Sequence, residues 1–222
     1  MAQSNQSVKT YDDLFLKIDH YAKYPAMLPY VGGNYISAIH KKLMLIGESN
    51  YFPETSTIHK DAIKWYDGNQ SLLSAEEIEW LNNRELTACA RHQNYKNIND
   101  CLAELKIAGS EKPISHISYM NAFQRPAVDT GKSFKYCCTE KDILISVATI
   151  DKVIEIIEPD IIIFVSKYSW DALHGKIAIK DELYMDFVSH PTDPFHWQNK
   201  KYLHGKMKFM KLLAGKYLQG TS

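Results

Sequence analysis

The chain has 222 residues, which suits one domain with a sizeable core. Hydrophobic residues make up 45% of it and charged residues 23%, as in ordinary soluble globular proteins. The 26 basic and 26 acidic residues cancel, so the net field does not attract phosphate and any nucleic-acid site must come from local charge.

The N-terminal residues 1–9 are polar and lack the apolar stretch of a signal peptide, so we expect a disordered tail there. No apolar run approaches the ~20 residues that cross a bilayer. The cysteines, Cys89, Cys101, Cys137 and Cys138, form no CxxC pair, which favours buried or half-buried free thiols over a zinc or iron–sulfur site. We therefore expect a cytoplasmic protein with no membrane partner, no metal and no cofactor.

The N-terminal half is predicted to place one buried strand among helices. Its elements are helix 11–23, strand 43–46, and helices 72–83 and 98–108 within a helical insertion over about 53–113. Pro25 ends the first helix, and Gly47 follows the strand. Ser74 and Glu77 have the spacing of a capping box, which supports the helix that follows them.

The C-terminal half is predicted to alternate strands with helices. Its elements are strand 114–120, loop 122–138, helix 139–157, strand 161–165, a short helix after Ser166, strand 183–188 and helix 203–218. Thr139 and Asp142 form a second capping pair, and residues 161–165 are β-branched and apolar on both faces. This alternation indicates an α/β fold with a mainly parallel four-stranded central sheet covered on both faces, in a single domain over 10–222.

Polar side chains follow all four predicted strands. In mainly parallel sheets, ligands bind beyond the carboxyl ends of the strands. Those ends carry Gly47-Glu48-Ser49-Asn50-Tyr51, Asn121, Ser166-Lys167 and Ser189-His190-Pro191-Thr192. Since the four ends meet at one edge of the sheet, the sequence predicts a functional site there, centred on the segment from Gly47 to Tyr51.

Two acidic side chains lie in or near this segment. Glu48 follows a buried strand and a glycine, and a carboxylate in such a crevice can orient water or act as a general base. Alternatively, it caps the next helix. Glu54 is either a second carboxylate of the same site or a solvated loop acid.

Histidines follow the last predicted strand. His190, restrained by Pro191, either donates to a developing negative charge or bonds a backbone carbonyl in a structural role. His196 and His204 lie further along, but their spacing matches no standard set of metal ligands. The pattern therefore favours proton or hydrogen-bond chemistry over metal chemistry.

Aromatic, amide and basic side chains provide candidate binding groups. Tyr51 and Phe52 either stack on a planar ring or pack the loop. Asn121 either reads a base edge through two hydrogen bonds or holds a neighbouring loop. A phosphate-tracking groove, or simply a solvated face, is formed by Arg125, Lys132, Lys135, Lys167, Lys200 and Lys201, interleaved with Tyr136, Tyr168, Phe195 and Trp197.

Two of these motifs, in this order, resemble the uracil-DNA glycosylase superfamily. Its members carry a water-activating motif after the first strand, Gly-Gln-Asp-Pro-Tyr-His or Gly-Glu-Ala-Pro-Gly, and a His-Pro motif after the last. Here the positions read Gly47-Glu48-Ser49-Asn50-Tyr51-Phe52 and His190-Pro191-Thr192-Asp193. The motif positions usually held by aspartate and proline are occupied by Ser49 and Asn50. The resemblance spans about residues 43–195. The first motif is similar to that of an uncharacterised bacterial subgroup of the superfamily.

The resemblance implies a three-layer α/β/α fold and a pocket for a flipped base. Glu48 then handles water, His190 stabilises the departing base and Asn121 recognises it. The other implied substrate-binding residues are Gly47, Ser49, Asn50, Tyr51, Phe52, Glu54, Ser166, Pro191 and Thr192.

Three hypotheses follow for the function. The first is a DNA glycosylase-like hydrolase that cleaves an N-glycosidic bond to release a damaged or deaminated base of the uracil type. The second is a non-catalytic module of the same fold that binds nucleic acid or nucleotide. The third is a hydrolase or transferase of a small nucleoside-like metabolite, which suits the neutral net charge. We expect DNA or a nucleobase-bearing ligand as the partner, and a monomer.

Overall fold

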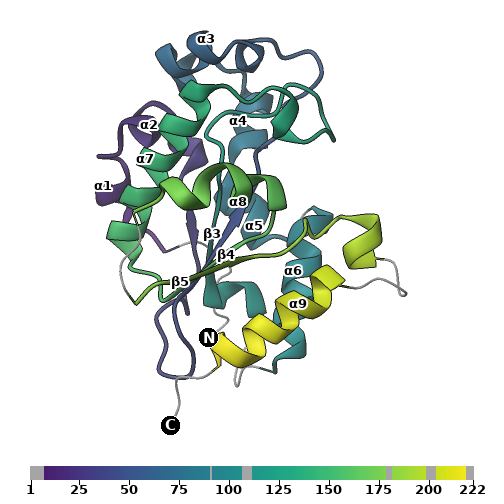
Figure 1. Cartoon of the computed structure of the whole chain (residues 1–222). Helices are drawn as coiled ribbons and strands as arrows, with labels where there is room; N and C mark the ends of the chain where they lie inside the picture. Colours follow the sequence, from purple (N-terminus) through teal and green to yellow (C-terminus); the bar gives the residue numbers. More distant parts are fainter. Residues whose placement is uncertain (1–7, 91, 107–111, 179–181, 199–203, 219–222) are drawn as a thin grey trace.

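A five-stranded mixed sheet lies at the centre of the computed structural model, which describes residues 8–90, 92–106, 112–178, 182–198 and 204–218 (Figure 1). Its strands are β1 (Tyr30–Val31), β2 (Leu43–Gly47), β3 (Ile117–Asn121), β4 (Ile161–Phe164) and β5 (Tyr184–Phe187), in the order β1-β3-β2-β4-β5. Strands β2 to β5 run parallel, and β1 pairs antiparallel with β3. The four-stranded prediction was therefore wrong by one edge strand, because two residues are too short to show an alternating pattern.

Nine α-helices are present in the described ranges: α1 (Asp12–Phe15), α2 (Asp19–Lys23), α3 (Ala62–Asp67), α4 (Ala75–Leu81), α5 (Asn83–Ala88), α6 (Gln93–Glu104), α7 (Glu140–Ile157), α8 (Lys167–Leu173) and α9 (His204–Leu212). Helices α3 to α6 lie between β2 and β3 in the chain. Both predicted capping boxes are confirmed, at Ser74 with Glu77 and at Thr139 with Asp142. The predicted helix over 11–23 is instead two helices, because Ile18 between them has an extended backbone.

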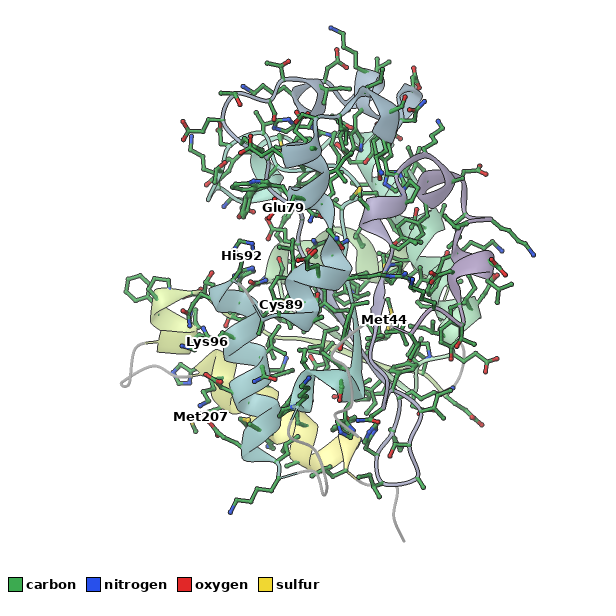
Figure 2. All side chains as sticks on the ribbon, turned by 180° about the vertical axis from the view of Figure 1, so that it is seen from behind. Met44, Glu79, Cys89, His92, Lys96 and Met207 are labelled. Carbon is green, nitrogen blue, oxygen red and sulfur yellow. The ribbon has the colours of Figure 1, made fainter. Side chains whose placement is uncertain are left out.

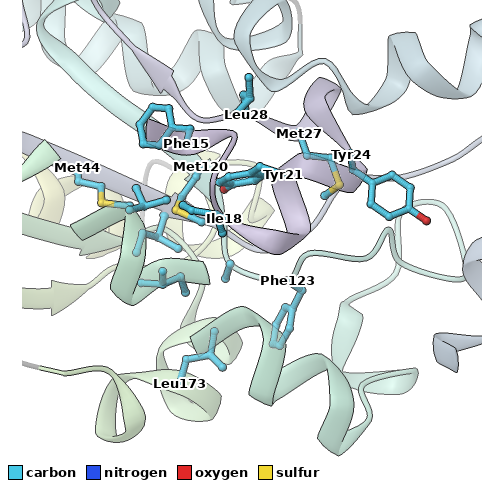
Figure 3. Close-up of a cluster of buried hydrophobic side chains, with 14 of the residues drawn as sticks. Phe15, Ile18, Tyr21, Tyr24, Met27, Leu28, Met44, Met120, Phe123 and Leu173 are labelled. Atoms are coloured by element: carbon cyan, nitrogen blue, oxygen red, sulfur yellow. The ribbon is translucent and has the colours of Figure 1, made fainter. Parts of the chain in front are cut away.

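The two faces of the sheet bury different side chains. Met44, Ile46 and Met120 point into one core cluster, which also contains residues of α1, α2, α7 and α8, as Figure 3 shows for Phe15, Tyr21 and Leu173. The alternate residues Leu43, Leu45, Ile117, Tyr119, Ile161 and Ile163 point into a second cluster with residues of α5, α6 and α9. Since strand side chains alternate between faces, the sheet forms the middle of three layers.

The ends of several elements differ from the predictions for local reasons. Strand β3 begins at Ile117, because Pro113–His116 forms a 3-10 turn first. After α9, residues Leu213–Tyr217 continue as a π-helix rather than an α-helix. Residues 1–7 of the predicted disordered tail, which covers residues 1–9, lie outside the described residues. Val8 of the same stretch is ordered, because its backbone N–H donates to the Val31 carbonyl at 2.8 Å. The predicted stop of the helix over 98–108, at Gly109, also lies outside the described residues.

A buried ion pair anchors the long loop before α7. Arg125 donates from Nε and Nη2 to the two carboxylate oxygens of Asp142, at 2.8 and 2.7 Å. Tyr66 donates to the same carboxylate, and Arg125 also donates to the carbonyls of His59 and Cys137. The Arg125 side chain is 1% exposed. Its predicted place in a solvent-facing groove was therefore wrong, because it is fully committed inside the fold.

In the described part of the chain, no helix combines the length and the apolar character that a membrane crossing requires.

Candidate functional site

The end of β2 is crossed closely by two side chains of β3. A Cβ atom placed on Gly47 would lie 2.0 Å from the Tyr119 hydroxyl and 2.4 Å from Asn121 Oδ1. Such distances are far below van der Waals contact, so only glycine fits here. Gly47 therefore lets the polar ends of β2 and β3 approach each other.

The Glu48 carboxylate is held by donors from two loops. Its Oε1 accepts the Ser133 hydroxyl at 2.8 Å and the Phe134 N–H at 2.6 Å. Its Oε2 accepts the Ser166 hydroxyl at 2.6 Å. Because a carboxylate oxygen has two acceptor positions, Oε1 is saturated and Oε2 keeps one position open. The side chain is thus fixed in place and still able to accept one further hydrogen bond.

His190 is oriented by the residue two positions further on. Its Nδ1 lies 2.8 Å from Thr192 Oγ1 and accepts the Thr192 N–H at 3.3 Å. A backbone N–H can only donate, so Nδ1 is an acceptor and the proton of the neutral ring sits on Nε2. Burial lowers the pKa of His190, while the charges of Glu48 and Asp193 oppose this. The ring is therefore a neutral N–H donor at neutral pH.

Two pockets meet at Glu48 and His190. The first, which we call the aromatic pocket, has a volume of about 410 Å³ and is lined by Tyr51, Trp80, Tyr95 and Tyr119 together with polar residues. The second, which we call the lysine pocket, has a volume of about 680 Å³ and is lined by Lys135, Lys167 and Lys208, among others. Glu48, Ser133 and His190 line both. A ligand at this junction can extend into either pocket.

The wall of the aromatic pocket comes partly from the segment between β2 and β3. Trp80 of α4, Leu86 of α5 and residues His92 to Tyr95 at the start of α6 all line it. Figure 2 shows His92 at the end of α6 that faces Glu79 of α4. Burial raises the pKa of Tyr95 to about 12, so its hydroxyl stays protonated at neutral pH. The helical segment therefore supplies one side of the site.

Three buried asparagines lie beneath this pocket. Asn121 donates from Nδ2 to Asn50 Oδ1 at 2.9 Å and to Asn83 Oδ1 at 3.3 Å, and its own Oδ1 accepts the Tyr119 hydroxyl at 3.3 Å. Asn50 donates in turn to Asn83 at 2.9 Å. The amide of Asn121 is thus used by the protein itself. Asn121 therefore holds neighbouring segments, and because it also lines the aromatic pocket, its contact with a base stays a prediction.

The residues after Gly47 separate into lining and buried positions. Ser49, Asn50 and the half-buried Tyr51 line the aromatic pocket. Phe52 is 2% exposed and makes edge contacts with the rings of His59 and Trp65, so it belongs to the core and lines neither pocket. Glu54 is exposed and also lines neither pocket. Stacking on a ligand ring is therefore open to Tyr51 alone of the predicted pair.

The remaining predicted residues lie around the junction. Ser166 lines the lysine pocket and also caps α8 by accepting the Ser169 N–H. Thr192 lines the aromatic pocket. Pro191 is buried, and its carbonyl accepts Asn97 Nδ2 at 2.7 Å, which ties the His190 loop to α6. The structure therefore brings the ends of β2, β4 and β5 to one junction.

The predicted basic groove is not a continuous surface. Lys132 pairs with Asp129 at 3.1 Å, and Lys167 pairs with Asp171. Trp197 is buried, whereas Phe195 and Tyr136 are exposed. Lys200 and Lys201 lie outside the described residues. Arg125 is paired inside the fold. Among the described basic residues of the predicted groove, this leaves Lys135 as the one without an ion pair to a described residue.

Within the described ranges, no group of three or more His, Cys, Asp or Glu side chains is placed to hold a metal ion. The rings of His196 and His204 are 6.5 Å apart between centroids, and both line the lysine pocket. The cysteines are free thiols: Cys101 is buried, Cys137 and Cys138 are half-buried, and Cys89 is exposed. Cys89 is thus the one that departs from the prediction.

Several lining residues were missed from the sequence. Tyr119 and Asn121 alternate on the same strand, so the period of two places Tyr119 at the site as soon as Asn121 is placed there. Ser133, Tyr95 and Lys208 come from distant segments with no motif around them, and nothing in the pattern marks them.

No protein-family model matches the chain, and no curated protein sequence matches it.

Proposed function

We propose that this protein hydrolyses an N-glycosidic bond and releases a nucleobase, as a DNA glycosylase-like enzyme does. The observation that carries the proposal is the junction itself, where a fixed carboxylate with one open acceptor position and a neutral histidine N–H line the same two pockets. One group accepts a proton and the other donates a hydrogen bond, which is the pair that such a hydrolysis needs.

Glu48 acts on the water molecule in this proposal. The open position on Oε2 accepts a hydrogen bond from water and orients its oxygen towards the sugar carbon C1′. As the C1′–N bond breaks, its electron pair leaves with the base, the water oxygen bonds to C1′, and a water proton passes to the carboxylate. The clamp of Ser133, Phe134 and Ser166 keeps the carboxylate aligned throughout.

His190 acts on the departing base. Negative charge develops on the base as the bond breaks, and the Nε2–H donates a hydrogen bond to a carbonyl oxygen of the ring. Nε2 has no hydrogen-bond partner among the described residues, so it is available to a ligand. The base nitrogen then takes a proton from solvent and Glu48 returns its proton to solvent, so that one water molecule is consumed and the products are the free base and the sugar with a hydroxyl on C1′.

The aromatic pocket holds the base. Of its aromatic side chains, the half-buried Tyr51 and Trp80 can offer a ring face to a planar base, and a volume of about 410 Å³ accommodates a nucleoside. The Asn121 amide supports the pocket floor by donating to Asn50 and Asn83, and its Oδ1, which accepts one bond from Tyr119, keeps one acceptor position for a base. Base choice then depends on the pocket walls and on His190.

The test is a base-release assay on oligonucleotides that contain uracil, hypoxanthine, xanthine or a thymine mismatch, run beside free nucleosides. Glu48→Gln keeps an oxygen for the Ser133 and Phe134 donors but removes the base, so we expect the rate to fall about 10³-fold at unchanged melting temperature. Lys152→Ala, on the exposed face of α7 where Lys152 pairs with Glu155, is the control and should retain full activity. Wild-type activity in Glu48→Gln would refute the assignment.

A second candidate is a binding module of the same fold without catalysis. The three donors on Glu48 favour it, because a carboxylate so fully engaged also serves as a structural link between loops. Binding of a base-bearing ligand with no base released from any substrate in the same assay would select this candidate.

A further inference from the structure

The lysine pocket is not explained by base binding alone. It adjoins the proposed catalytic pair and the aromatic pocket, since Glu48, Ser133 and His190 line both pockets. Its other polar lining residues are the lysines Lys135, Lys167 and Lys208, the acids Asp171 and Asp193, and the hydroxyls of Ser166, Tyr168 and Ser189 with His196 and His204. A ligand that fills this pocket must therefore form favourable contacts with both lysine and carboxylate side chains.

Two of the three lysines are already paired. Lys167 bonds Asp171, and Lys208 bonds Asp186 at 2.6 Å. Both ammonium groups also lie over the ring of Phe187, at 5.9 and 4.2 Å from its centroid. Such pairing leaves little positive charge for an incoming anion at these two positions.

Lys135 differs from these two. Its ammonium lies 4.7 Å from the centroid of the Tyr136 ring and forms no ion pair within the described part of the chain. It follows directly on Ser133 and Phe134, which hold Glu48. The lysine pocket therefore offers one lysine without an ion pair to a described residue, adjacent in the chain to the clamp on Glu48.

An extended nucleic-acid strand needs more than this. A strand carries one negative charge per nucleotide, and proteins bind it through a series of uncommitted cations along its path. Here Arg125 is buried against Asp142, Lys132 pairs with Asp129, and Asp193, which forms no ion pair with a described residue, adds a negative charge at the pocket. The described surface thus matches a ligand with a single phosphate and several hydroxyls.

We propose that the ligand of this site is a free nucleoside monophosphate, with its base in the aromatic pocket and its sugar phosphate in the lysine pocket beside Lys135. This inference rests on the proposed N-glycosidic hydrolysis and specifies its substrate class. Carboxylates of the lysine pocket accept hydrogen bonds from the sugar hydroxyls, and its serine hydroxyls accept or donate hydrogen bonds to them. The ammonium of Lys135 forms an ion pair with the phosphate. The net charge of zero suits a small anionic substrate, which needs no long-range attraction by the whole protein.

The experiment compares base release from uridine and inosine, from their 5′-monophosphates, and from a single-stranded oligonucleotide containing the same bases. We expect kcat/KM for the monophosphates to exceed that for the nucleosides about 10-fold, and Lys135→Ala to remove this preference through an increase in KM. Lys132→Ala is the matched control, because Lys132 belongs to the same loop and lines neither pocket. It should keep the preference.

The outcomes separate the two proposals. Release from the oligonucleotide alone, or equal release from nucleoside and monophosphate, overturns the mononucleotide inference and leaves N-glycosidic hydrolysis standing. Release from none of the three substrates overturns the proposed function and, with it, this inference. A preference for the monophosphate that survives Lys135→Ala would show that the phosphate is bound elsewhere.

Discussion

The two ends of the central strands carry polar groups that are arranged in opposite ways. At the carboxyl ends, Glu48 keeps an open acceptor position and His190 an unpaired N–H within the described residues, beside two pockets. At the amino ends, His40 and His116 precede β2 and β3 and bond each other at 2.8 Å. Both ends hold histidine, half-buried at His190 and buried at His40 and His116, but only the first leaves hydrogen-bonding capacity for a ligand.

The amino-end pair is closed by its neighbours. Asn34 donates to His116 Nε2 at 3.4 Å, His116 Nδ1–H donates to His40 Nε2, and His40 Nδ1–H donates to the Lys41 carbonyl at 2.9 Å. His40 also stacks on Tyr217, whose hydroxyl donates to the His116 carbonyl. Every ring nitrogen has a partner, so this pair links three segments of the chain and has no capacity left for chemistry.

This comparison shows which buried polar groups point to function. Burial and a lowered histidine pKa occur at both ends, so neither feature separates a catalytic residue from a structural one. What separates them is the count of used and open hydrogen-bonding positions. We therefore expect substitutions at the amino ends to lower stability and substitutions at the carboxyl ends to lower activity.

The largest effect is expected for removal of the amino-end pair. His116→Ala should lower the free energy of unfolding by about 2 to 3 kcal/mol, because it removes a buried ring and leaves the buried Nε2 of His40 without its partner. Base release per folded molecule should not change. Urea unfolding and the base-release assay measure the two quantities.

A double-mutant cycle is the control for this stability effect. His40→Ala and the double variant should show a coupling energy of about 1 kcal/mol, because the two rings bond each other. Loss of activity in His116→Ala at full folding would contradict the division between a structural and a functional end.

A smaller effect is expected from pH. Burial lowers the pKa of His116 to about 4 and also lowers the pKa of His40, and a charged His116 would turn an acceptor nitrogen towards another donor. A lowered histidine pKa stabilises the fold fully above the unfolded value near 6.5, and this contribution is lost as the pH falls from about 6.5 towards 4. We expect a loss of roughly 1 to 2 kcal/mol across that window.

Denaturation curves at a series of pH values measure this loss. The decrease in the free energy of unfolding per pH unit should be smaller in the double variant His40→Ala, His116→Ala than in the wild type. It should not vanish, because burial also lowers the pKa of His20, to about 3, and adds a contribution of the same sign. An unchanged slope in the double variant would show that other groups control the acid sensitivity.

The fold was largely predictable because its strands are short, apolar and separated by capped helices. The structure contains strands within one residue of the predicted runs 43–46 and 161–165, and the predicted capping box of Thr139 and Asp142. Strand β1 was missed, because its two residues are held by pairing with β3 rather than by their own pattern. Local sequence thus determined the elements whose stability is local.

The site was predictable in position but not in detail. Glu48 and His190 follow strands, so the topology brings them to one edge. The clamp by Ser133 and Phe134, the commitment of the Asn121 amide and the burial of Arg125 depend on contacts between segments more than 15 residues apart in the chain. Neither spacing nor residue type records such contacts, which explains why the burial of Arg125 was not predicted.

The smallest effect is expected at the residue that orients His190. Thr192→Val keeps the shape of the side chain and the backbone N–H to Nδ1 but removes the Oγ1 contact at 2.8 Å. The ring then spends more time with its proton on Nδ1, where it cannot donate to the departing base. We expect kcat to fall about 3-fold with KM unchanged, because His190 acts on charge that forms only in the transition state. A change in KM alone would instead mean that Thr192 contacts the bound base and that His190 is oriented by other means.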